Sequence, residues 1–168
     1  MPYHKGYPTH RNRMTQRRRL EWATTSFALN AVASGAQAAT DLLSNFVADG
    51  GSREGLTIMR THIVGAFAAA STGGQGRVGL IVAGLSAGQA AGGELDPVAN
   101  PYEPWLIDSV VFPTTSGATV DASTPFHYDI RSKRKVQHVQ ETLWLVFHPT
   151  DSGTTSLAGL ARVLVALP

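Results

Sequence analysis

The chain has 168 residues, with 14 Lys and Arg, 12 Asp and Glu, and no cysteine. The absence of cysteine excludes disulfide bonds and thiolate metal sites, and no apolar run approaches the roughly 20 residues of a membrane-spanning helix. A chain of this length is expected to form one main domain that is large enough to bury a core.

Positive charge is concentrated in residues 1–20, which we call the arm. The arm contains no acid, and its six cations are Lys5, Arg11, Arg13, Arg17, Arg18 and Arg19. The remaining residues carry eight Lys and Arg against twelve Asp and Glu, so the arm is +6, the body is −4 and their sum is the net charge of +2. A segment this poor in aliphatic residues cannot offset its ordering entropy, so we expect a disordered arm. A disordered cationic arm predicts contact with nucleic acid, because each neutralised phosphate releases a counterion.

The body, residues 21–168, begins with a predicted strand at 21–34. This run is rich in β-formers with partial alternation. The side chains expected to face one way are Phe27, Leu29, Ala31 and Ala33. Residues 36–49 fit either a short helix or a loop, and the sequence leaves that choice open.

The middle of the chain predicts two strands and a long loop. Residues 56–70 read as a long strand with a bend or bulge at Gly65. Residues 77–87 are apolar at both alternating positions, which predicts a central strand covered on both faces. Residues 88–104 hold three glycines and three prolines and are expected to form a functional or partner-packed loop.

The last third of the chain completes an all-β pattern. The further predicted strands span 105–112, 126–133, 142–148 and 157–167. Seven or eight strands with Gly-, Pro- and Thr-rich connections indicate a β-sandwich or barrel. Among these folds we expect a jelly-roll β-sandwich of about eight antiparallel strands, preceded by the disordered basic arm.

A second basic cluster lies in and after the predicted strand 126–133. Its members are Arg131, Lys133, Arg134 and Lys135. In an extended strand Arg131, Lys133 and Lys135 share one face, and Arg134 points the other way. Three cations on one face repel one another unless an anion lies opposite, which predicts a nucleic-acid-binding patch beside the arm. The alternative is a solvated edge strand whose lysines prevent stray strand pairing.

Charged and very large side chains also occur inside predicted strands. Arg60 and Arg162 are each flanked by apolar residues. Because an unpaired buried Arg is costly, we expect pairing with an acid in the fold or across a subunit contact, with direct phosphate contact as the alternative. Trp22, Trp105 and Trp144 are expected to be core or interface anchors.

The sequence predicts neither an enzyme nor a cofactor or metal site. It contains no G-x-S-x-G nucleophile elbow, no P-loop and no H-E-x-x-H. The six histidines have no helical i, i+4 pair that would suit a metal ion.

Several segments carry a resemblance to a known class of proteins. They are the runs TIMRTHIVG, EPWLI, DIRSKRKVQHVQETLWLVF and LARVLVALP. With the basic arm and the Ala-, Gly- and Thr-rich body, they resemble the jelly-roll coat proteins of small icosahedral viruses, in particular those with single-stranded DNA genomes. The resemblance implies a self-assembling shell subunit whose inward-facing arm contacts the packaged genome.

This reading predicts two partners and a location. The partners are further copies of the chain, about 60 or a multiple, and a single-stranded nucleic acid; no membrane is involved. The expected location is the virion, together with the host nucleus during assembly where the host has one. The alternative is a non-assembling β-barrel module, such as an OB-like domain, that binds single-stranded nucleic acid.

Overall fold

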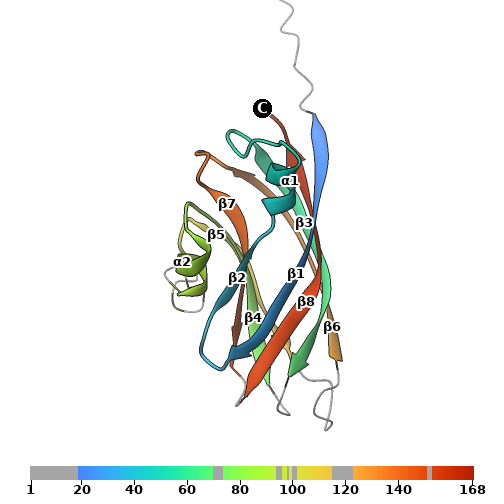
Figure 1. The fold of residues 1–168 in the computed structure, drawn as a ribbon, viewed down its shortest axis with the longest axis vertical. Helices are drawn as coiled ribbons and strands as arrows, with labels where there is room; N and C mark the ends of the chain where they lie inside the picture. The colour runs from blue at the N-terminus through green and yellow to red at the C-terminus, as the bar shows by residue number, and fades with distance from the viewer. Residues whose placement is uncertain are drawn as a thin grey trace, which may run out of the picture.

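A computed structural model describes residues 19–69, 74–93, 96–97, 99, 102–114, 123–150 and 153–168. In this part of the chain, eight strands and two short helices form two four-stranded antiparallel sheets packed face to face (Figure 1). The elements are β1 (Leu20–Ala33), β2 (Ala38–Asp41), α1 (Ser44–Ala48), β3 (Thr57–Ala69), β4 (Gln75–Ala83), α2 (Ala87–Ala91), β5 (Leu106–Pro113), β6 (Ser123–Lys135), β7 (Thr142–Pro149) and β8 (Thr154–Ala166). Neither of these helices is long and apolar enough to cross a membrane.

The strand order identifies the fold as a jelly roll. The first sheet has the order β1-β8-β3-β6 and the second has the order β2-β7-β4-β5. The last two strands therefore return to pair with the first two, one in each sheet, which is the double Greek key of a jelly-roll sandwich. The predicted all-β jelly roll is confirmed. The arm was predicted to be disordered, and its residues 1–18 lie outside the described part of the chain.

Alternation of apolar and polar residues builds the core between the sheets. Phe67 is fully buried, and its ring packs against those of Phe112, Phe126 and Phe147. In the first sheet Gly65 lies opposite Gly159, on adjacent strands. A side chain at Gly65 would collide with the carbonyl of Ala158 and the ring of Phe126, so glycine is required here by the close approach of its neighbours.

Strand β1 was predicted correctly as a strand, but the predicted alternation of inward and outward side chains holds only as far as Leu29. The pairing register with β8 shifts between Leu29 and Val32, and Ala31 adopts a positive φ of 49°. This bulge turns Val32 inward and leaves Ala31 and Ala33 exposed, which contradicts their predicted placement with Phe27 and Leu29. The bulge expected at Gly65 lies instead between Ile58 and Arg60 of β3.

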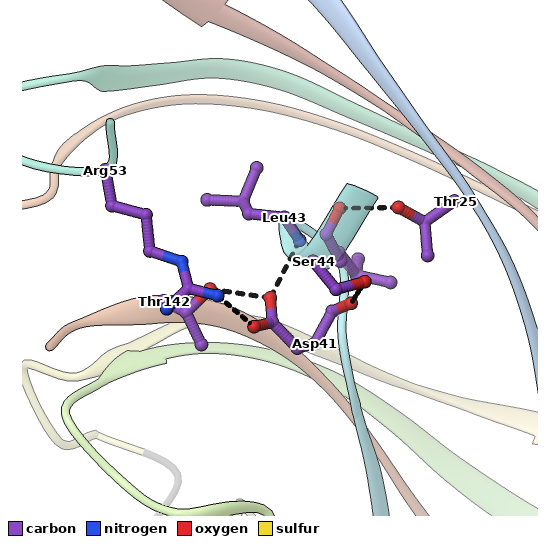
Figure 2. Close-up of polar contacts among 7 residues, drawn as sticks. Thr25, Asp41, Leu43, Ser44, Arg53 and Thr142 are labelled. Atoms are coloured by element: carbon purple, nitrogen blue, oxygen red, sulfur yellow. Dashed lines mark hydrogen bonds and ion pairs between the residues drawn. The ribbon is translucent and has the colours of Figure 1, made fainter. Parts of the chain in front are cut away.

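Residues 36–49 form neither one helix nor a loop. They contain β2, which pairs with β7, followed by the single turn of α1. Asp41 joins these elements (Figure 2): its carboxylate accepts hydrogen bonds from the Leu43 N–H at 2.8 Å, the Thr142 hydroxyl at 2.6 Å and the Arg53 guanidinium at 2.5 Å. This network ties β2, β7, α1 and the connection to β3 together at one end of the sandwich.

Strand β4 is buried on both faces, as predicted, because the second sheet has an outer cover. Ile81, Trp144 and Val146 form a small outer core with Ala90 of α2. The predicted strand 77–87 ends at Ala83, and the predicted loop 88–104 overlaps α2. Helix α2 is begun by a capping box between Ser86 and Gln89. The outward face of the second sheet is therefore packed against α2, and within the described residues no helix packs on the outward face of the first sheet.

Candidate nucleic-acid interface

The root of the arm is anchored at one end of the first sheet. The Arg19 carbonyl accepts a 2.8 Å hydrogen bond from the Leu167 N–H, next to the β1–β8 pair. The Arg19 side chain is 79% exposed and lies 3.8 Å from the Glu21 carboxylate, a solvent-screened contact that contributes little. The other arm cations, Lys5, Arg11, Arg13, Arg17 and Arg18, lie outside the described residues.

The second basic cluster lies on β6 with the predicted alternation. Arg131, Lys133 and Lys135 are exposed on the outward face, while Arg134 points to the opposite side and is half-buried. The Nε atom of Arg134 is buried without a hydrogen-bond partner in the described chain. Among the described residues, the three outward cations form no ion pair, so their charge is available to an external anion.

The register places the root of the arm and the tip of β6 at the same end of the same sheet. Leu20 pairs with Ala166, Ala166 pairs with Thr57, and Thr57 pairs with Lys135. The arm root and the tip of β6 are therefore separated by three strand spacings, about 14 Å. The start of β1 and the C-terminus lie together at this end in Figure 1.

Further cations extend the cluster across the first sheet. We call this outward surface the cationic face; its charged and titratable members are Arg60, Arg131, Lys133, Lys135, Arg162, Asp129, His62 and His127. Five cations against one acid give the cationic face a net charge of +4, although the body as a whole carries −4. Charge is thus segregated within the body as well as between the arm and the body.

Arg60 and Arg162 differ in their partners. Arg60 makes a bidentate ion pair with Asp129, through Nε at 2.8 Å and Nη2 at 2.5 Å, as the expected pairing with an acid required. The hydrogen bond with Arg60 lowers the pKa of Asp129 below its usual value, and Asp129 in turn raises the pKa of Arg60. Arg162 has no acidic partner in the described chain; its guanidinium lies over the Trp22 ring, 4.9 Å from the centroid.

Two histidines occupy the middle of the cationic face. The rings of His62 and His127 meet edge to face with their centroids 4.8 Å apart. His62 lies between Arg162 and Asp129 in one cross-strand row. Among the described residues, no group of three or more His, Asp or Glu side chains is placed to hold a metal ion.

Acidic groups gather beyond the edge of β1 instead. A pocket of about 490 Å³ beside this edge strand is lined by Glu21, Asp49 and Glu54, together with Trp22 and Phe46. Its carboxylates repel phosphate, so they favour placement of a polyanion on the cationic face rather than around the free edge of β1.

Comparisons with known proteins give only distant structural likenesses. No protein-family model matches the chain, and no curated protein matches it either. The chain is similar to the Tobacco streak virus coat protein, with 13% identity, a TM-score of 0.42, and coverage of 89% of this chain and 87% of that one. It is also similar to a chain of turnip yellow mosaic virus, with 11% identity, a TM-score of 0.43, and coverage of 100% and 87%.

A third similar structure is VP2 of the infectious bursal disease virus subviral particle. The identity is 13% and the TM-score 0.40, with coverage of 90% of this chain and 33% of that one. With TM-scores below 0.5, these likenesses carry no functional argument.

One member of this surface was not predicted from the sequence. Trp22 was expected to be a core or interface anchor; it is 41% exposed and borders the cationic face, so it is not a core residue, and its place in an interface stays a prediction. Trp144, by contrast, is only 5% exposed. The available signal was the alternation of β1: Ala23, Thr25 and Phe27 point inward, so Trp22 must point outward.

Proposed function

We propose that this chain is the subunit of a self-assembling viral shell and packages a single-stranded genome through its arm and cationic face. One observation supports this most strongly: the root of the arm and the basic tip of β6, more than 100 residues apart in sequence, lie at one end of one sheet, about 14 Å from each other. The jelly roll is also the fold of lectins and cupins, so the fold alone would not decide the function.

The charges suit a packaging role. Each subunit supplies six cations from the arm and a net four from the cationic face, so about 60 subunits would neutralise on the order of 600 phosphates. That would offset part of a genome of one to several thousand nucleotides, and mobile cations would neutralise more. Whether the genome is DNA, as the sequence resemblance implies, or RNA is an outcome of the test below.

Self-association is favoured by the rest of the surface. The body carries twelve acids and eight cations, of which one acid and five cations lie on the cationic face, so eleven acids and three cations lie elsewhere. This remaining surface exposes large apolar side chains at Val47, Val111 and Val139, and exposed apolar side chains favour contacts with other copies. The sequence segments that resemble coat proteins fall in β3, at the start of β5 and in β6, β7 and β8, so they include three of the four strands of the first sheet.

The test is expression of the full chain and of a variant lacking residues 1–19, followed by negative-stain microscopy and nuclease-protected nucleic acid analysis. We expect closed particles roughly 20 nm across from the full chain. The truncated chain should fold but give empty particles or none. Genome-filled particles from the truncated chain would contradict the role of the arm.

The alternative is a nucleic-acid-binding module that does not assemble. The two four-stranded sheets differ from the five-stranded barrel of an OB-like domain, so this alternative now takes the form of a non-assembling jelly roll. A stable monomer or dimer in light scattering, with salt-dependent binding of single strands, would favour it over the shell.

A further inference from the structure

Trp22 is the one large aromatic side chain that the described strands of the first sheet leave on the outward side. The residues that follow it keep the alternation of the strand, since Ala23 is buried and Thr24 is exposed. The indole is 41% exposed and lies in one cross-strand row with Leu164, Arg60 and Arg131. An exposed aromatic ring in the same row as two arginines can contact a base while the arginines contact phosphates.

We propose that Trp22 and Arg162 form a nucleobase-stacking site on the cationic face. Bases stack on aromatic rings and on the flat guanidinium of Arg, and this stacking tolerates any sequence. The Arg162 guanidinium already lies 4.9 Å from the centre of the indole, so one base extends the stack with little rearrangement. This inference rests on the proposed function and adds which chemical part of the genome the body contacts.

The neighbouring rows provide the rest of the site. Next to the Trp22 row lies Arg162 with His62, and then Leu160 with Val64 and His127. Leu160 and Val64 are 39% and 40% exposed, so an apolar strip runs beside the flat rings of the histidines. A strip of this kind on an open sheet accommodates about two or three bases.

The charges set the path of the backbone. Arg131, Lys133 and Lys135 lie on the β6 side of Trp22, whereas Glu21, Asp49 and Glu54 lie beyond the β1 edge. Phosphates are therefore attracted across β8 and β3 toward β6. The nucleic-acid strand thus runs across the first sheet from the arm root toward β6. The bases lie against the sheet while the phosphates reach the flanking cations.

The test compares two probes of equal charge. The first is a 12-nucleotide single-stranded oligothymidylate, and the second is an abasic 12-mer with the same phosphodiester backbone. Both are titrated into the full chain, kept unassembled as judged by light scattering, at several salt concentrations. Affinity is measured by fluorescence anisotropy. The emission of Trp22 is obtained by subtracting the tryptophan emission of the Trp22→Leu variant from that of the wild type.

We expect the oligothymidylate to quench Trp22 emission. Trp22→Leu should bind this probe about tenfold more weakly, with an unchanged salt slope and an unchanged affinity for the abasic probe. Trp22→Phe should restore much of the affinity, because it restores a ring. Trp105→Phe is the matched control, since it alters a half-buried tryptophan in the turn before β5, packed on the outer core of the second sheet.

Three results would overturn the inference. If both probes bind with equal affinity, and Trp22→Leu changes neither, the bases do not stack at Trp22 while the proposed function stands. If neither probe binds, the proposed function is wrong, and the stacking site, which rests on it, is wrong as well. If Trp22 emission changes on assembly without nucleic acid and becomes insensitive to the oligothymidylate, a second copy covers this surface.

Discussion

Asp129 limits the positive charge of the cationic face. Its ion pair with Arg60 holds one of the five cations, and the hydrogen bond keeps the pKa of Asp129 below its usual value, so the carboxylate stays charged at neutral pH. The Asp129→Asn variant removes this acid and releases Arg60. The net charge of the face then rises from +4 to +5.

We therefore predict that Asp129→Asn binds single-stranded nucleic acid more tightly. One more effective charge should change the logarithmic salt slope by about 0.7 and raise the affinity about fivefold at 0.1 M salt. Anisotropy titrations over a salt series measure both quantities. Asp49→Asn, which removes an acid in the pocket beyond the β1 edge, should have a smaller effect; equal effects would mean that only total charge matters.

Tyr128 joins the two sheets and predicts a pH dependence. Its hydroxyl donates a 3.0 Å hydrogen bond to Asp108 of β5. Burial, and then the nearby Asp108 carboxylate, raise the pKa of Tyr128 well above its ordinary value. A raised pKa in the folded state means that the proton stabilises the fold fully below the unfolded pKa of about 10, and that this stabilisation is lost as the pH rises above it.

We predict that the free energy of unfolding falls above about pH 10, and that this fall is shallower in Tyr128→Phe. At neutral pH the same variant should lose about 1 to 2 kcal/mol through the missing hydrogen bond. Urea unfolding at pH 8, 10 and 11 measures both effects. Tyr102→Phe, at a side chain that is 97% exposed, should follow the wild type, and a matching change there would argue against the role of Tyr128.

Asp41 connects β2 to β7 and to the segment before β3. Its carboxylate accepts three hydrogen bonds at a site where Asp41 and Arg53 are only 19% and 21% exposed. Asp41→Asn should lower the free energy of unfolding by about 2 to 3 kcal/mol, because the Arg53 cation loses its counter-charge. Thermal unfolding measures the loss. Asp49→Asn serves as control, and an unchanged stability in Asp41→Asn would show that the network is dispensable.

At the scale of the elements, β3 and β8 approach most closely at Gly65 and Gly159. Gly65→Ala inserts a methyl group against the Ala158 carbonyl and the Phe126 ring, so it should destabilise the fold by about 3 kcal/mol. Gly88→Ala in α2 meets nothing within 4 Å and should stabilise by up to about 1 kcal/mol. Chemical denaturation compares the two, and similar values would mean that the sheet relaxes around the extra methyl group.

The same elements show what could be predicted from sequence. Alternation located β1, and it placed Arg131, Lys133 and Lys135 on one face, because a strand has a fixed period of two. It could not locate the β1 bulge, where Ala31 has the positive φ more usual for glycine. It also missed β2, since four residues are too few to show a period.

The sequence alone was enough to name the cations of the candidate site, but not to show that they lie on one surface. The sequence named the arm and the cluster on β6, and it anticipated an acidic partner for Arg60. Their meeting at one end of a sheet depends on the pairing of Leu20, Ala166, Thr57 and Lys135, which are distant in sequence. Trp22 was expected to be a core or interface anchor, although the alternation of β1 was enough to place its side chain outward.

At the scale of the whole molecule, the outward faces of the two sheets differ in what covers them. The second sheet packs against α2 through a small outer core, whereas in the described part of the chain the first sheet has no such cover and is basic. A shell that packages nucleic acid would place the bare sheet and the arm inside. The lysines make this orientation measurable, because Lys5, Lys133 and Lys135 are the only three in the chain.

The most direct measurement is therefore lysine labelling of intact particles with an amine-reactive polymer too large to enter the shell, read out by peptide mass spectrometry. We predict no labelling of Lys5, Lys133 or Lys135 while the particles are closed, and labelling of all three after disassembly and removal of the nucleic acid. Labelling of Lys133 and Lys135 on closed particles would put the cationic face outside and contradict its role in packaging.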